Sequence, residues 1–70
     1  MERKRYLELC QKFAIGQDIK VEYNSALYRP WKYELGFDNK VKSIHTAILC
    51  DINSNSVVYC ELRDVKEEEK

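Results

Sequence analysis

The sequence has little of what catalytic sites are usually built from. Its 70 residues include two glycines, one proline and one histidine. Gly16 and Gly36 stand far apart, so the chain has no glycine-rich phosphate-binding loop and no glycine elbow for a nucleophile. His45 is the only histidine that could activate a thiol, and a core of this size can hardly enclose a substrate pocket. The sequence therefore predicts a protein that is not an enzyme and needs no cofactor.

The cysteine pattern lacks the spacing of the usual zinc sites. Cys10, Cys50 and Cys60 form no C-x-x-C pair, and structural zinc sites are usually built from such close pairs. His45 lies an odd number of residues from Cys50, which puts the two on opposite faces of an extended strand. An odd number of thiols fits a reducing compartment better than a disulfide framework. We expect free core cysteines and no metal.

Long apolar runs and net charge are also absent. No stretch approaches the roughly 18 apolar residues of a membrane span, and Met1 leads directly into charged residues instead of a signal peptide. We therefore expect a cytoplasmic protein. Twelve basic and twelve acidic residues give a net charge of zero, which argues against electrostatic binding of bulk nucleic acid. The basic cluster Arg3, Lys4 and Arg5 and the acidic cluster 67–69 are expected to be solvated ends.

Residues 2–14 are predicted to form a helix. Tyr6, Leu9 and Phe13 recur at spacings of three and four, the period of one helix face. Gly16 is the expected stop, because glycine takes a left-handed conformation at little cost. One helix cannot bury its own apolar face, so it must pack against another element.

That element is predicted to be an antiparallel sheet over residues 18–65. Apolar residues alternate with period two, which places Trp31 and Tyr33 on one face. Pro30 lacks a backbone N–H, so we expect a bend at Arg29 and Pro30. The third strand is apolar on both parities, which is typical of a central strand covered on both faces. The predicted strands are 18–23, 26–37, 41–52 and 56–62, separated by polar turns at 24–25, 38–40 and 53–55.

The C-terminal segment completes the predicted fold. Residues 63–65 are expected to form one short helical turn before a brief final pairing, and the acidic tail 66–70 is expected to be frayed. All connections are short, so neighbouring strands pair antiparallel. We therefore predict a single α+β domain over residues 1–70, in which an N-terminal helix precedes a four- to five-stranded antiparallel meander that curls into a small open barrel.

The aromatic residues are the most informative feature with respect to function. Most of the five tyrosines, two phenylalanines and one tryptophan are expected in the core, because aromatic rings bury large areas. One segment nevertheless combines Tyr28, Arg29, Trp31 and Tyr33, residue types that are enriched at protein-interface hot spots. The same types suit stacking on single-stranded bases. Structural core, protein interface and nucleic-acid surface all stay open for this segment.

Five segments, 20–24, 28–30, 46–51, 55–57 and 62–65, together with the helical pattern Tyr6-x-x-x-Cys10, carry a resemblance. They look like small uncharacterised proteins of bacteriophages and mobile elements in Gram-positive bacteria, which implies a host-directed role. The strand–turn–strand that ends in Leu62-x-x-Val65 also resembles an SH3-like barrel, in which a short helical turn precedes the last strand. Neither resemblance brings catalytic residues.

The sequence thus predicts a non-enzymatic protein-binding module, which the resemblance makes a phage-encoded inhibitor or modulator of a host or defence protein. Its predicted partner contacts are the four residues of segment 28–33 named above. The first alternative is a small nucleic-acid-binding SH3-like domain that uses the basic cluster. The second is a homodimeric structural protein, joined through an exposed edge strand or the helix face.

Overall fold

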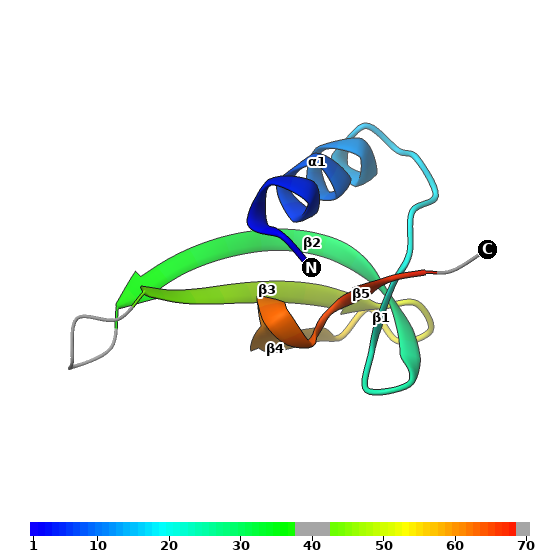
Figure 1. Cartoon of the computed structure of the whole chain (residues 1–70). Coiled ribbons are helices and arrows are strands. Elements are labelled where there is room, and N and C mark those ends of the chain that lie inside the picture. The colour runs from blue at the N-terminus through cyan, green and yellow to red at the C-terminus, as the bar shows by residue number, and fades with distance from the viewer. Residues whose placement is uncertain (38–42, 69–70) are drawn as a thin grey trace.

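A computed structural model describes residues 1–37 and 43–68 of the chain (Figure 1). Its elements are α1 (Arg3–Ala14), β1 (Val21–Tyr23), β2 (Ala26–Phe37), β3 (Ser43–Asp51), β4 (Val57–Glu61), the 3₁₀ helix η1 (Leu62–Asp64) and β5 (Lys66–Glu67). One helix thus precedes a five-stranded antiparallel sheet, and the predicted α+β class is confirmed. The strand order is β4-β3-β2-β1-β5, so the described residues form an open sheet with β4 and β5 at its edges.

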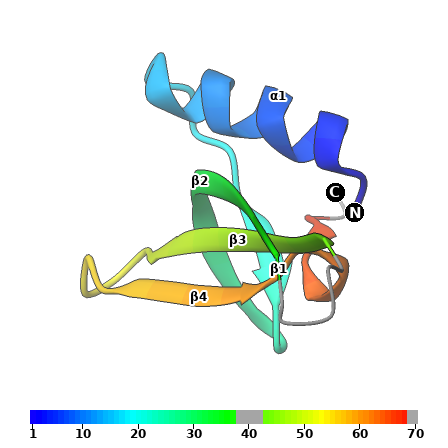
Figure 2. The same cartoon turned by 90° about the vertical axis from the view of Figure 1, so that its left-hand side faces the viewer.

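The helix α1 is anchored on the sheet by Tyr6. Tyr6 is fully buried and Leu9 nearly so, and the helix lies over β2 (Figures 1 and 2). The Tyr6 hydroxyl donates a hydrogen bond to Ile48 O at 3.0 Å and lies 3.4 Å from Lys32 O. These carbonyls belong to residues that are directly opposite in the β2–β3 pair, so one hydroxyl ties α1 to both strands. Burial raises the pKa of the Tyr6 phenol well above its usual value, which keeps it a neutral donor.

The helix ends at the predicted stop. Gly16 has a φ of 101°, in the left-handed region that glycine adopts without steric cost. Its N–H donates to Phe13 O at 2.9 Å, and the Gln17 N–H donates to Lys12 O at 3.1 Å. This pair of bonds is a Schellman motif, which satisfies two carbonyls of the last helical turn.

A two-residue turn joins β1 to β2. Tyr23 pairs with Ala26, which leaves Asn24 and Ser25 as the loop, with φ values of 52° and 64°. Two successive left-handed residues form a type I′ turn, whose twist matches that of the flanking strands. The predicted turn at 24–25 is therefore confirmed. The predicted turn at 38–40 and the first two residues of the predicted strand 41–52 lie outside the described residues.

A β-bulge in β2 changes which residues share a face. The register shifts between Pro30 and Lys32. Pro30 is fully buried opposite Leu49, and Tyr33 also packs against the core, so Trp31 and Lys32 between them both face the other way. The predicted bend at Pro30 is confirmed. The expectation that Trp31 shares a face with Tyr33 is wrong, because the bulge inserts one residue into the alternation.

The central strand β3 supplies much of the core. Ala47 and Leu49 are fully buried on the side that α1 covers, while Ile48 and Cys50 alternate with them and are buried on the opposite side. The prediction of a central strand whose side chains are buried on both faces is therefore confirmed. The core cluster beneath α1 consists of Tyr6, Leu9, Val21, Ala47, Leu49, Leu62 and Val65.

The C-terminal segment returns the chain to the far edge of the sheet. Leu62 and Val65, on either side of the η1 turn, are both buried in the core cluster. Lys66 and Glu67 then pair with β1 as β5. The short helical turn and the final pairing were predicted correctly. Residues 66 and 67 were expected to be frayed, but they belong to the sheet.

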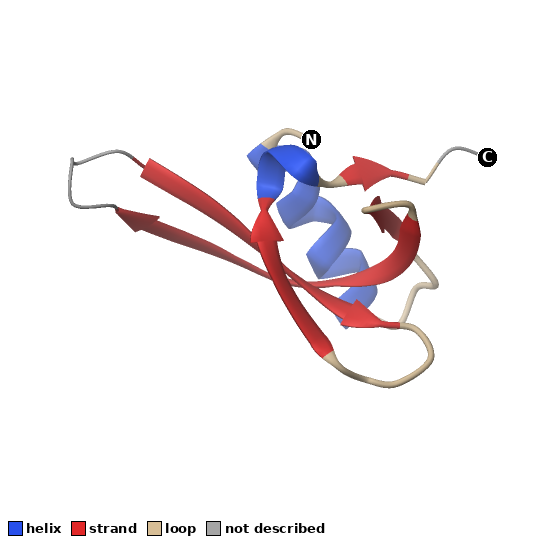
Figure 3. Ribbon diagram, turned by 90° about the horizontal axis from the view of Figure 1, so that it is seen from below, coloured by secondary structure: helices blue, strands red, loops and turns tan. Residues whose placement is uncertain are grey.

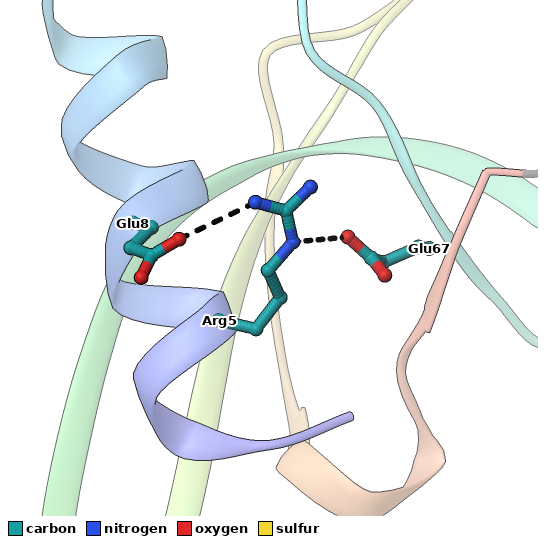
Figure 4. Close-up of polar contacts among 3 residues, drawn as sticks. All are labelled: Arg5, Glu8 and Glu67. Carbon is teal, nitrogen blue, oxygen red and sulfur yellow. Dashed lines mark hydrogen bonds and ion pairs between the residues drawn. The ribbon is translucent and has the colours of Figure 1, made fainter.

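The two charged ends are exposed, as expected, and an ion pair joins them. Arg5 Nε donates to Glu67 Oε1 at 2.6 Å, and Arg5 Nη1 lies 3.3 Å from Glu8 Oε2 (Figure 4). Both ion pairs are about half exposed, so each contributes little to stability. The pair of Arg5 with Glu67 shows that β5 lies beside the first turns of α1.

Candidate protein-binding surface

The structure divides the four predicted contact residues between the two sides of β2. Tyr28 and Tyr33 pack against the core cluster. Arg29 alternates with Tyr28 and lies opposite Cys50, so it faces the other side. The bulge places Trp31 on that side as well. Arg29 and Trp31 therefore share a face that the two tyrosines do not reach.

The two inward tyrosines belong to the internal packing. The Tyr28 ring lies 6.2 Å from Tyr23 and the Tyr33 ring 6.5 Å from Tyr6, both typical distances of aromatic pairs. The Tyr33 hydroxyl also forms a hydrogen bond with His45 Nδ1. Of the three interpretations left open by the sequence, these contacts support a core role for this pair.

The side of the sheet away from α1 carries an apolar surface. Seen from below, the strands lie in front of the helix (Figure 3). Directly opposite residues in an antiparallel sheet share a face, so rows of side chains can be followed across β2, β3 and β4. The first row is Arg29, Cys50 and Val57, and the second is Lys32, Ile48 and Tyr59.

We name Arg29, Trp31, Ile48, Val57 and Tyr59 the outer patch. Val57, Trp31 and Tyr59 are 43%, 52% and 67% exposed, whereas Ile48 is only 3% exposed. Three exposed apolar side chains from β2 and β4 therefore lie around a nearly buried isoleucine of β3 on this side of the sheet. Exposed apolar side chains gathered on one face are typical of sites that bind a partner.

Arg29 is the polar member of the outer patch. Its Nε is shielded from solvent, and no described residue accepts a hydrogen bond from it. A buried donor without a partner costs about 1–3 kcal/mol. The charges nearby are already paired: Lys32 Nζ lies 3.8 Å from Glu34 Oε1, and Arg63 Nε lies 2.5 Å from Glu61 Oε2. Arg29 forms no ion pair with a described residue, so its charge is the one in this patch that a partner's carboxylate could still pair.

Two members of the outer patch, Val57 and Tyr59, were not predicted from the sequence. Val58 and Cys60 alternate with them and pack against the core, so β4 is apolar on both parities. The apolar residues on both faces of β4 were the sequence signal for this surface. They indicate an exposed apolar surface only when β4 is known to be an edge strand with one covered face, and the sequence does not show that position.

The basic cluster proposed for nucleic acid does not form one surface. The Arg3 guanidinium lies over the Tyr33 ring, 5.9 Å from its centroid. Arg5 is engaged by Glu8 and Glu67, and Lys4 is exposed. The three side chains therefore act separately, and two of the three are already in contact with other groups.

The cysteines have the environment of core thiols. Cys10 and Cys60 pack against the core cluster, and Cys60 Sγ lies 3.6 Å from Ala47 O. Burial raises the pKa of both thiols, that of Cys60 to about 11. In the described part of the chain, no three His, Cys, Asp or Glu side chains are grouped so that they could hold a metal ion.

The raised pKa of Cys60 predicts slow alkylation. Because the thiolate is the reactive form, a shift from 9.0 to about 11 should slow its reaction with iodoacetamide at pH 8 on the order of 100-fold relative to the denatured chain. The thiol ionises first in the unfolded state, so its contribution to stability falls as the pH rises from 9 towards 11. Timed alkylation followed by peptide mass spectrometry measures the rate. Equal rates in the folded and the denatured chain would show that Cys60 is not a buried thiol with a raised pKa.

Comparisons with protein-family models, with curated proteins and with solved structures each found no match to this chain. The resemblance to phage and mobile-element proteins therefore stays a prediction. Within residues 1–37 and 43–68, no helix combines the length and the apolar character needed to cross a membrane.

Proposed function

We propose that this chain is a non-enzymatic protein-binding module whose contact surface is the outer patch. The observation that carries the proposal is the side of the sheet left uncovered by α1, where three large apolar side chains are 43–67% exposed around a buried one. A chain of this length has a marginal core. A partner that covers the patch would remove apolar surface that the fold itself leaves in water.

The residue types in the outer patch indicate the chemistry of the partner. Tryptophan, tyrosine and arginine dominate interface hot spots, and the patch contains one of each. A carboxylate is the acceptor that best fits a guanidinium, and Arg29 forms no ion pair among the described residues. The proposed partner is therefore a protein that places apolar side chains against Trp31 and Tyr59 and a carboxylate beside Arg29.

A module of this kind acts by covering a surface of its partner, which requires no catalytic group. Inhibition of a host or defence protein by a phage-encoded chain would work in this way. We propose this inhibition as the more specific role of the module. The order β4, η1, β5 places a short helical turn before the last strand, which supports an SH3-like classification.

Capture experiments with matched variants test the proposal. The tagged protein is incubated with bacterial lysate, with and without nuclease, and Trp31→Ala and Tyr59→Ala are compared with the parent chain. Each variant should weaken binding of a captured protein by about 30-fold, the effect of losing a hot spot of about 2 kcal/mol. Phe37→Ala is the control, because Phe37 is an aromatic residue of β2 that is 68% exposed and lies outside the outer patch.

The outcomes separate the candidate partners. A captured protein that binds all variants equally would refute the role of the outer patch. Capture that nuclease abolishes would favour the nucleic-acid alternative. A molecular mass that rises with concentration in light scattering, and that Tyr59→Ala returns to the monomer value, would identify the partner as a second copy joined at the β4 edge.

A further inference from the structure

A cavity of about 420 Å³ opens where the start of α1, the start of β3 and η1 meet. This volume falls within the roughly 300–1,000 Å³ typical of small-molecule sites, although a chain of this length was not expected to provide one. No residue of the outer patch lines the cavity. The cavity is therefore a different site from the proposed protein-binding surface.

Arg3 is a positioned and uncompensated cation at this cavity. Its guanidinium lies 5.9 Å from the centroid of the Tyr33 ring, a distance at which the ring attracts a cation. The Tyr33 hydroxyl is bonded in turn to His45 Nδ1, and His45 also lines the cavity. No carboxylate of the described residues forms an ion pair with Arg3. Its positive charge is thus available to a ligand.

The rest of the lining indicates what the ligand must look like. The carboxylate of Glu61 is neutralised by Arg63, 2.5 Å away, so the cavity as a whole is positive. Ser43 adds a hydroxyl donor, and Ile44 and Leu62 add apolar walls. A ligand that fits has an anionic group for Arg3 and an apolar part for the walls.

We infer that this cavity binds an aromatic phosphomonoester of nucleotide size, with its phosphate on Arg3. The planar guanidinium matches phosphate oxygens with two parallel hydrogen bonds. Phosphate alone would leave the apolar walls unfilled, and a neutral nucleoside would leave Arg3 without an anion. Both parts of the ligand are therefore needed for binding.

Chemical-shift titration of the ¹⁵N-labelled chain tests this inference with adenosine 5′-monophosphate as the probe. Saturable shifts are expected at the amides of Arg3, Ser43 and His45, whereas adenosine and inorganic phosphate should each bind at least about 10-fold more weakly. Arg3→Gln should weaken binding of the nucleotide about 10-fold or more. Lys4→Gln is the control, because it removes the same charge from the neighbouring exposed residue and should leave the affinity unchanged.

A second variant and an oligonucleotide probe complete the test. Arg63→Gln frees the carboxylate of Glu61 and should also weaken nucleotide binding, which keeps the test valid if Arg3→Gln does not fold. A short oligonucleotide that binds only with its 5′-phosphate would identify a chain end as the source of the ligand, whereas a bound mononucleotide and an unbound oligonucleotide would identify a free nucleotide. Absence of saturable shifts, or equal losses in Arg3→Gln and Lys4→Gln, would overturn the inference.

Discussion

Replacing Tyr6 with alanine is expected to remove about half of the stability of the chain or more. Tyr6 is fully buried and is the largest side chain of the core cluster, and truncation of a buried aromatic residue costs about 3–5 kcal/mol. A domain of this length has a total stability of only roughly 4–10 kcal/mol. The loss also removes the hydroxyl that ties α1 to Ile48 O and approaches Lys32 O. Circular dichroism during urea denaturation measures the effect.

The matched variant Tyr6→Phe separates the hydroxyl from the ring. It keeps the apolar packing and should lower stability by about 1–2 kcal/mol, because the Ile48 carbonyl loses a buried donor. For a chain of this size, that corresponds to a fall in Tm of roughly 4–16 °C. An alanine variant as stable as the parent would show that α1 is not anchored through Tyr6.

Replacing both Leu62 and Val65 with alanine is the second change expected to have a large effect. Leu62 is 4% exposed and Val65 is fully buried, and together they carry the segment that closes the core between β4 and β5. The substitutions remove three carbon atoms at Leu62 and two at Val65 and leave cavities in the core. Together they should lower the stability by about 4–6 kcal/mol. Thermal denaturation followed by circular dichroism should then show no cooperative transition, or one well below that of the parent.

Glu67→Gln in the same segment is the control for this prediction. It removes the ion pair between Glu67 and Arg5, which is about half exposed, and should change stability by no more than about 0.5 kcal/mol. If the double variant were as stable as the control, the C-terminal segment would not be part of the core. If the control were as damaging as the double variant, the ion pair would matter more than the buried side chains.

The helix and the short turns could be predicted because each depends on its own residues. Tyr6 and Leu9 were placed on the buried face by their spacing alone, and Gly16 was recognised as the stop because it adopts a left-handed conformation easily. The two-residue turn at Asn24 and Ser25 follows the same logic. Backbone preferences over a few residues decide these features, so a single sequence is sufficient to find them.

The candidate surface was predicted only in part because it combines residues distant in the sequence. Arg29 and Trp31 were identified by residue type, but Tyr33 was grouped with Trp31 by a period-two count that ignores the bulge. Val57 and Tyr59 were overlooked because an apolar residue on an edge strand looks the same in sequence as one in a central strand. The difference between them is which neighbour covers the strand.

The sequence by itself determined the order and type of the elements, the bend at Pro30 and the free state expected of the thiols, since these follow from local propensity and residue chemistry. Only the tertiary structure decided which apolar side chains are covered. The helix packs on one side of the sheet, β4 remains at an edge, and the bulge turns Trp31 towards the uncovered side. Burial is a property of the packed elements together, so no segment of the chain specifies it alone.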